Sequence, residues 1–347
     1  MIKTKAYAAQ SANVPLTPFE FERRPVGDHD ILIEILYCGV CHTDIHAVRN
    51  DWGGTMYPIV PGHEIIGRVI QTGKAVTRFK INDISGAGYL YDSCRHCYQC
   101  AHDAEQYCEN GITPIMGGQE RETGAPLYGG YASKLVIDER YAVKVPAALP
   151  LAAAAPLLCA GITTYSPLKY IKAGPGHKIG IAGLGGLGHM AVKFAKALGA
   201  EVTVLSTSTA KEQDAEKLGA DHFVWLSDLE AIKTLYGHFD FIIDTISAPH
   251  DYNIYVNLLK VNGSLILVGL PGTPLQLDVS GLIFKRRSIS GSLIGSIHET
   301  QEMLEFCAEK NIVADIEIIP VSRINEAYER MIKGDIKYRF VIDMATL

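Results

Sequence analysis

A run of glycines near the middle of the chain places the strongest limit on how this sequence can fold. It follows a short apolar segment, Lys178–Ala182, and precedes Leu187–Leu198, in which apolar residues recur at helical spacing. Glycines between a strand and a helix permit a tight turn and let the backbone approach a pyrophosphate that faces the helix N-terminus. A chance run of glycines lacks such flanks, so the pattern predicts a dinucleotide-binding loop. Its expected binding residues are Gly183, Gly185, Gly186, Leu187 and Gly188.

From residue 154 to residue 292 the sequence alternates between strand-like and helix-like segments. Such alternation predicts right-handed βαβ crossovers and a parallel sheet covered on both faces. We therefore expect an α/β protein with a doubly wound Rossmann domain over 154–292. The predicted strands are 178–182, 201–205, 222–225, 239–244, 264–268 and 288–292, and the predicted helices are 187–198, 210–218, one from 227, and 252–259.

The end of the second predicted strand indicates which dinucleotide binds. NAD-binding sites usually carry Asp or Glu there, to bind the ribose 2′-hydroxyl. This chain instead has Ser206, Thr207 and Ser208, followed by Lys211. Hydroxyls and an ammonium group suit a 2′-phosphate, which a carboxylate would repel. The pattern favours NADP(H), although Ser208 or Thr209 could also serve as a helix N-cap.

The remaining chain, 1–153 and 293–347, is expected to form a second, β-rich domain. Its first part has short strand-like runs separated by glycine-containing turns, and its tail is expected to fold back onto that part. The predicted elements are strands 31–37, 65–72, 134–137 and 339–343 and helices 299–310 and 324–333.

Four closely spaced cysteines, Cys94, Cys97, Cys100 and Cys108, form the pattern C-x2-C-x2-C-x7-C. Four thiolates at this spacing can surround a tetrahedral Zn²⁺ with no open position, which is a structural site. Binding of the ion would order a lobe over about 89–112. A zinc module for nucleic acid is the alternative, but the lobe has few basic residues and the chain carries a net charge of −6.

A second, scattered set consists of Cys41, His63, Glu64 and Cys159. Each has an ordinary alternative, because a buried cysteine is usually a small hydrophobe and a lone histidine is often structural. Together they offer two thiolates and an imidazole, with Cys159 placed near the start of the nucleotide domain. Such a set predicts a metal beside the nicotinamide. Packing is the expectation for the two other cysteines, Cys38 and Cys307.

Composition places few further limits on the chain. Apolar residues make up 48% and charged residues 20% of the 347, which is typical of a globular protein. The apolar stretch Leu149–Leu168 is interrupted by prolines and is expected to join the domains rather than to span a membrane. The N-terminus lacks the apolar core of a signal peptide. We expect a cytoplasmic protein that binds neither membrane nor nucleic acid.

The motifs together resemble the zinc-dependent medium-chain alcohol dehydrogenases, and within them the cinnamyl alcohol dehydrogenase-like branch. The resemblance implies a GroES-like catalytic domain and a Rossmann domain. It also implies transfer of a hydride between NADP(H) and a primary alcohol or aldehyde, with two zinc ions per chain. The matching segments are CGVCHTDIH, YPIVPGHEIIGRV, the four-cysteine lobe, CAGITTY, GLGGLGHMAVKFAKALGAEVTVLS, LVGLPG, GSLIGS and YRFVID.

The resemblance also implies roles for residues around the scattered set. Cys41, His63 and Cys159 would ligate the catalytic zinc, with Glu64 beside the metal as a transient ligand. Asp44 would orient the histidine ligand. Thr43 and His46 would relay the alcohol proton to solvent through the cofactor ribose. A non-enzymatic NADP(H)-binding protein of the same fold is the alternative, and it is disfavoured because the ligand and relay positions are all filled.

Further cofactor and substrate positions follow from the same resemblance. The cofactor contacts are Thr163, Val268, Gly269, Leu270, Ser292, Ile294 and Arg339, the last on the pyrophosphate or, alternatively, in a surface salt bridge. Trp52 and Leu90, with Tyr89 and Tyr91, would line an apolar substrate channel, although core packing is an alternative for Trp52. Thr113 stands where plant members usually have Trp, which favours a broad aldehyde reductase for aromatic or medium aliphatic substrates. We expect a homo-oligomer, either a dimer or a tetramer.

Overall fold

Short apolar runs in the middle of the chain form a six-stranded parallel sheet in the computed structural model, which describes residues 1–272 and 274–347. The strand order is β12-β11-β10-β13-β14-β15. In chain order this is 3-2-1-4-5-6, the arrangement of doubly wound dinucleotide-binding sheets, and the predicted fold class is confirmed. The strands are β10 (Lys178–Ala182), β11 (Glu201–Ser206), β12 (His222–Trp225), β13 (Phe239–Asp244), β14 (Leu259–Leu267) and β15 (Ser288–Gly291).

The central strands of this sheet are buried because helices supply apolar side chains to cover them. Phe239, Ile242 and Leu265 are fully buried in one cluster with residues of the following helices. Burial on both faces explains the nearly continuous apolar sequence of β10 and β13. The helices are α4 (Ala160–Tyr170), α5 (Gly188–Ala197), α6 (Glu212–Lys217), α7 (Leu229–Thr234), α8 (Tyr252–Leu258) and α9 (Ser280–Ile283), with a 3-10 turn at Thr209–Lys211.

The β-rich part is built on a seven-stranded sheet of order β16-β17-β3-β4-β5-β9, in which β8 also pairs with β3. Only β16 and β17 pair in parallel. Two smaller sheets pair β1 with β2 and β6 with β7. The strands are β1 (Ile2–Ala8), β2 (Thr17–Arg23), β3 (Asp30–Gly39), β4 (Ile65–Thr72), β5 (Ile84–Ala87), β6 (Leu90–Asp92), β7 (Thr113–Pro114), β8 (Lys134–Asp138), β9 (Val143–Lys144), β16 (Ile316–Pro320) and β17 (Arg339–Asp343).

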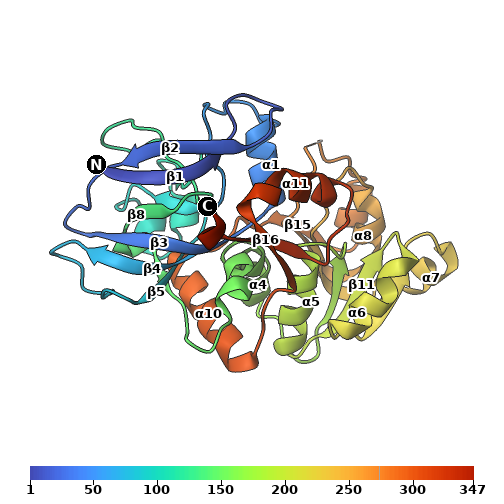
Figure 1. The fold of residues 1–347 in the computed structure, drawn as a ribbon. Helices are drawn as coiled ribbons and strands as arrows, with labels where there is room; N and C mark the ends of the chain where they lie inside the picture. Colours follow the sequence, from blue (N-terminus) through green and yellow to red (C-terminus); the bar gives the residue numbers. More distant parts are fainter. Residues whose placement is uncertain (273) are drawn as a thin grey trace. The chain divides into compact units, whose positions relative to one another are not determined.

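The C-terminal tail supplies two of these strands, as its predicted return to the first domain requires. Strand β17 pairs with β3, so the two ends of the colour scale in Figure 1 meet in one sheet. Helix α10 begins with a capping box, in which Ser296 and Glu299 satisfy each other's backbone N–H groups.

The helices of the β-rich part are α1 (His42–Arg49), α2 (Tyr98–Ala101), α3 (Leu151–Ala154), α10 (Ile297–Lys310) and α11 (Ile324–Ile332), with 3-10 turns at 105–107, 139–141, 155–158, 321–323 and 344–346.

Contacts divide the chain into two units. The first consists of Met1–Ile162 and Gly295–Leu347, and the second of Thr163–Ile294. The expected boundaries at 153/154 and 292/293 lie a few residues earlier. Cys159 therefore belongs to the first unit and not, as expected, to the start of the nucleotide domain. Among the described residues no single helix is long and apolar enough to cross a membrane. Two helical segments, Leu151–Leu158 and Ala160–Tyr170, reach that length and apolarity only when they are counted together, and the chain bends between them.

Candidate functional site

The first turn of helix α1 positions two side chains of the scattered set. Cys41 is the N-cap, and Asp44 stands at the third helical position. The Asp44 Oδ2 atom accepts a hydrogen bond from the backbone N–H of Cys41 at 2.9 Å. A carboxylate at this place satisfies a backbone donor of the first turn and complements the helix dipole. The start of the helix therefore fixes the Cys41 backbone.

The same carboxylate orients His63. His63 Nδ1 lies 2.8 Å from Asp44 Oδ1, and the backbone N–H of Gly62 donates to that oxygen at 3.0 Å. The hydroxyl of Tyr131 donates to Oδ2 at 3.2 Å. Asp44 is fully buried, and a buried carboxylate is tolerated only when donors surround it. With Nδ1 directed at Asp44, the His63 Nε2 atom is the one that faces the two cysteines.

Cys159 completes the cluster from the turn that precedes α4. Its Sγ atom lies 3.9 Å from Cys41 Sγ and 3.2 Å from His63 Nε2. A tetrahedral zinc ion with Zn–S bonds of about 2.3 Å would separate two sulfurs by about 3.8 Å. Two buried sulfurs and an imidazole at these distances suit zinc. The pKa of the Cys41 thiol is lowered well below its usual range, mainly by the hydrogen bond from Cys159, so one of the two is readily a thiolate.

Glu64 is the fourth member of this group, and its carboxylate lies between the cluster and Arg339. The ligand atoms of Cys41, His63, Glu64 and Cys159 all lie within 4.8 Å of one another. Glu64 Oε1 pairs with the Arg339 guanidinium, whereas the buried Oε2 has no partner among the described residues. Burial raises the pKa of Glu64 to about 7, against the opposing charge of Arg339. An unpartnered buried oxygen in this position suits a transient metal ligand.

The burial of Arg339 excludes one of the two roles expected for this residue. It is only 3% exposed, so a surface salt bridge is wrong. Its guanidinium Nε has no partner among the residues described, although another nitrogen pairs with Glu64. Contact with a pyrophosphate stays a prediction.

The expected relay residues share helix α1. Thr43 is half-buried, and His46 is partly exposed with its Nδ1 atom 2.7 Å from Asp51 Oδ2. The His46 ring lies 5.0 Å from the ring of Trp52. Trp52 is 48% exposed, so core packing, its alternative, is wrong.

The segment before the cysteine lobe departs from its expected role. Leu90 is 2% exposed and offers almost no surface to a substrate. Tyr91 directs its hydroxyl toward Arg24 and Glu120, so its polar end is taken up by an ion-pair cluster. Tyr89 is the member that lies beside the metal cluster, with its ring edge-on to His63 at 5.7 Å. Thr113 is buried.

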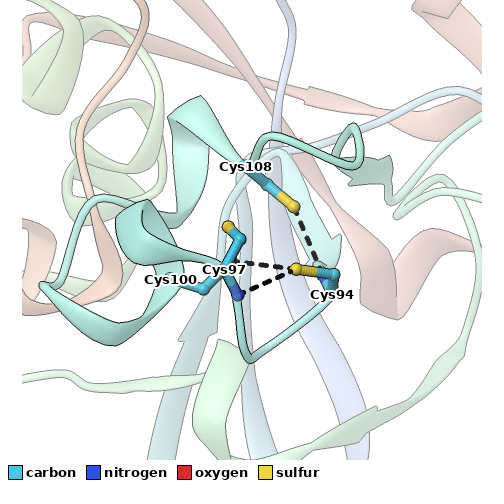
Figure 2. A group of neighbouring side chains, drawn as sticks. All are labelled: Cys94, Cys97, Cys100 and Cys108. Carbon is cyan, nitrogen blue, oxygen red and sulfur yellow. Dashed lines mark hydrogen bonds between the residues drawn. The ribbon is translucent and has the colours of Figure 1, made fainter.

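The four-cysteine lobe forms a closed cluster of sulfurs in the first unit. Figure 2 shows Cys94, Cys97, Cys100 and Cys108 converging from the loop and the short helix α2. Their sulfurs all lie within 4.8 Å of one another. The backbone N–H of Cys97 donates to Cys94 Sγ at 3.3 Å, and hydrogen bonds, first from the Asn110 side chain, lower the pKa of Cys94 to about 5. Four sulfurs with thiolate-stabilising donors suit a structural zinc ion.

In the second unit, the glycine loop connects β10 to α5 as expected. Gly183 has φ +85°, which favours glycine. A Cβ at Gly188 would lie 2.2 Å from the Gly183 carbonyl oxygen, so only glycine fits. The Thr245 hydroxyl donates to the Ala182 carbonyl at 2.8 Å and holds the neighbouring loop against the turn. These contacts give the tight turn and the close helix–strand packing that are typical of a dinucleotide-binding loop.

The hydroxyl cluster lies at the carboxyl end of β11. Thr207 and Ser208 are exposed, whereas Ser206 is 7% exposed and its Oγ accepts from the Ser208 N–H at 3.2 Å. Ser208 is the N-cap of a 3-10 turn but makes no side-chain capping bond. Ser208 therefore occupies the N-cap position, but its hydroxyl does not cap the turn. Lys211 ends the same turn.

The other expected cofactor positions lie in the second unit at the ends of β14 and β15 and in α4. The backbone N–H groups of Val268 and Gly269 both donate to the Asp244 carbonyl at 3.0 Å. The backbone N–H of Ser292 donates to the Leu267 carbonyl. Ile294 has a φ of +39°. Thr163 is 7% exposed. Their contacts with a cofactor stay predictions.

Comparison with known proteins decides the family. The alcohol dehydrogenase GroES-like domain family matches residues 27–147, and the zinc-binding dehydrogenase family matches 186–309. The NADP-dependent alcohol dehydrogenase C 1 of Mycolicibacterium smegmatis is 50% identical, covering 100% of this chain and 99% of that protein. Aldehyde reductase YahK of Escherichia coli is 51% identical with the same coverage. A cinnamyl alcohol dehydrogenase of Sorghum bicolor superposes with a TM-score of 0.96 at 44% identity, covering 99% of this chain and 98% of that one.

The chain belongs to the zinc-dependent medium-chain alcohol dehydrogenases, in the cinnamyl alcohol dehydrogenase-like branch. The resemblance inferred from the motifs is confirmed. Like the other members of this family, it is an oxidoreductase.

Two residues of this alcohol dehydrogenase were not found from its sequence. Tyr131 follows two glycines, and nothing in that pattern indicates that its hydroxyl reaches Asp44. Trp225 ends β12, and its indole N–H donates to the Thr207 carbonyl at 3.2 Å. The strand prediction for 222–225 was correct, but an isolated aromatic residue at a strand end gives no signal of a contact with the neighbouring loop.

Proposed function

We propose that this alcohol dehydrogenase transfers a hydride between NADP(H) and a primary alcohol or aldehyde. The convergence of two sulfurs and an imidazole is the observation that carries the proposal, because Cys41, His63 and Cys159 lie far apart in the sequence. A cluster of this composition leaves one position of a tetrahedral ion open for water or substrate. Two relatives of the chain, an NADP-dependent alcohol dehydrogenase and an aldehyde reductase, agree with this proposal.

Some residues of the site would hold the metal ion, and others would transfer the proton. A zinc ion held by Cys41, His63 and Cys159 would supply Lewis acidity, and the nicotinamide would supply the redox chemistry. Asp44 keeps the His63 ring in one tautomer and orientation. The Thr43 hydroxyl would pass its own proton on as it accepts that of the alcohol, and His46, paired with Asp51, would release a proton to solvent at the end of the relay.

A non-enzymatic NADP(H)-binding protein is the second candidate. It would have no need of a buried cluster of metal-ligand side chains. The Glu64 Oε2 atom, buried and without a partner among the described residues, costs free energy in a purely structural site. This cost supports an enzyme over a binding protein.

For the substrate, we propose aromatic or medium aliphatic aldehydes and their alcohols. The partly exposed ring of Trp52 and the ring of Tyr89 beside His63 offer apolar surface to such molecules. Thr113, where plant relatives of the branch usually have Trp, favours a broad range over a dedicated phenylpropenyl substrate.

The function is tested by NADPH oxidation with benzaldehyde, cinnamaldehyde and hexanal. We expect turnover with the wild type, and we expect Cys41→Ala to lower kcat by at least about 10³-fold because a metal ligand is lost. NADPH binding, followed by fluorescence, should persist in Cys41→Ala because the glycine loop is untouched. Turnover of Cys41→Ala near the wild-type rate would refute the proposed metal site, and a wild type inactive with all three aldehydes would refute the substrate class.

Cofactor preference is tested at the end of β11. Ser206→Asp places a carboxylate beside the expected 2′-phosphate, so we expect the ratio of kcat/KM for NADPH over NADH to fall by about tenfold or more, an electrostatic cost of ~1.4 kcal/mol. Ser206→Asn, which has the same size without the charge, is the matched control and should change the ratio less. If Ser206→Asp leaves the ratio at its wild-type value, the 2′-phosphate does not bind here.

We further propose that the protein is a cytoplasmic homodimer. None of the eight cysteines forms a disulfide, which is typical of a reducing compartment. Strand β15 is an edge of the six-stranded sheet, and near it in sequence Val279, Ile283 and Phe284 are 56%, 69% and 81% exposed. An open edge beside apolar side chains can pair with the same edge of a second copy about a two-fold axis.

The dimer is tested by the native mass. Light scattering should give about twice the mass of one chain for the wild type, and Phe284→Asp should shift the mass toward one chain because a charge would be buried at the interface. Tyr170→Asp, at an 86% exposed aromatic residue outside this edge, is the control and should leave the mass unchanged. A monomeric wild type, or a dimer that Phe284→Asp leaves intact, would contradict the assignment.

A further inference from the structure

Trp225 occupies the last position of β12, beside the end of β11. In the parallel register of the two strands it stands opposite Ser206. Its side chain is 43% exposed, and its indole Nε1 donates a hydrogen bond to the backbone carbonyl of Thr207 at 3.2 Å. The bond joins two segments that lie 18 residues apart in the sequence.

This bond is one of several that hold the segment after β11. The backbone N–H of Leu226 donates to the Ser206 carbonyl at 2.8 Å, and the Ser208 N–H donates to Ser206 Oγ at 3.2 Å. The Trp225 bond fixes the peptide between Thr207 and Ser208 from the side of the neighbouring strand. With this peptide fixed, both side chains are exposed. The Trp225 indole N–H is therefore one of the groups that fix the backbone between the two hydroxyl-bearing residues.

The exposure of Trp225 argues against a packing role alone. A large ring that contributes to a core is buried, whereas nearly half of this one is open to solvent. The position uses the polar end of the indole, which donates to a loop carbonyl. Phenylalanine would cover the same apolar surface at the strand end but could not make the bond.

We propose that Trp225 is a positioning residue for recognition of the cofactor 2′-phosphate, acting through the Thr207 carbonyl. The inference rests on the proposed preference for NADP(H) and names a residue that determines it. Loss of the indole N–H leaves the Thr207–Ser208 peptide held through the Ser208 N–H alone, and the hydroxyls then converge less well on one phosphate. A ligand without the 2′-phosphate gains nothing from this arrangement and is affected less.

The experiment measures binding without turnover, by isothermal titration calorimetry on the full chain. The probes are 2′,5′-ADP, which carries the 2′-phosphate, and 5′-AMP, which lacks it. We expect Trp225→Phe to weaken 2′,5′-ADP by roughly three- to tenfold more than 5′-AMP, as the loss of one hydrogen bond allows. Tyr236→Phe, at a 58% exposed aromatic residue of the same unit, is the matched control and should leave both affinities unchanged.

Each outcome decides the inference. Equal weakening of both probes by Trp225→Phe would show a structural role only, and unchanged affinities would show that the bond is dispensable; either overturns it while leaving the NADP(H) preference intact. A wild type that binds both probes equally overturns the preference itself, and the inference with it. Trp225→Leu, checked by circular dichroism, is measured in parallel, so that the test does not depend on one variant folding.

Discussion

The buried carboxylate of Asp44 connects the parts of the metal site that the chain brings from different elements. It accepts hydrogen bonds from the backbone of Cys41 and Gly62, from the His63 ring and from the Tyr131 hydroxyl. Burial of an unpaired charge costs several kcal/mol, so the carboxylate is stable only while these donors surround it. The first turn of α1 and the segment before β4 are thereby held in one relative position, and two proposed zinc ligands with them.

In the second unit, the proposed cofactor site depends on backbone geometry rather than on a buried charge. There Gly183 adopts a positive φ, and Gly188 lies so close to the Gly183 carbonyl that a Cβ would not fit. The strand order 3-2-1-4-5-6 places the carboxyl ends of β10 and β11 side by side, which brings the glycine turn and the hydroxyl cluster to the same edge. In the proposed function, recognition of the 2′-phosphate at this edge depends on a few exposed side chains of one loop.

Much of this arrangement could be predicted because it follows from local patterns. Strands β4, β10, β12, β13 and β17 have the predicted bounds, since apolar runs between turns are a strong signal. The unit to which Cys159 belongs could not be predicted. The turn before it, at 155–158, packs against β3, β4, β5 and β17, although in the sequence it lies next to the nucleotide domain. Leu90 and Tyr91 are both buried although they are neighbours in β6, so both sides of this strand are covered, and the sequence of so short a strand does not indicate it.

The central claim is that Asp44 holds the ligands of one metal site and has no part in the other. Zinc content, measured by mass spectrometry during dialysis against a chelator, tests it on the wild type and Asp44→Asn. We expect about two zinc ions per wild-type chain, and loss of one of them about 10- to 100-fold more readily in the variant, with the four-cysteine zinc retained. A wild type with a single zinc ion, or an Asp44→Asn variant that keeps both as firmly as the wild type, would contradict the account.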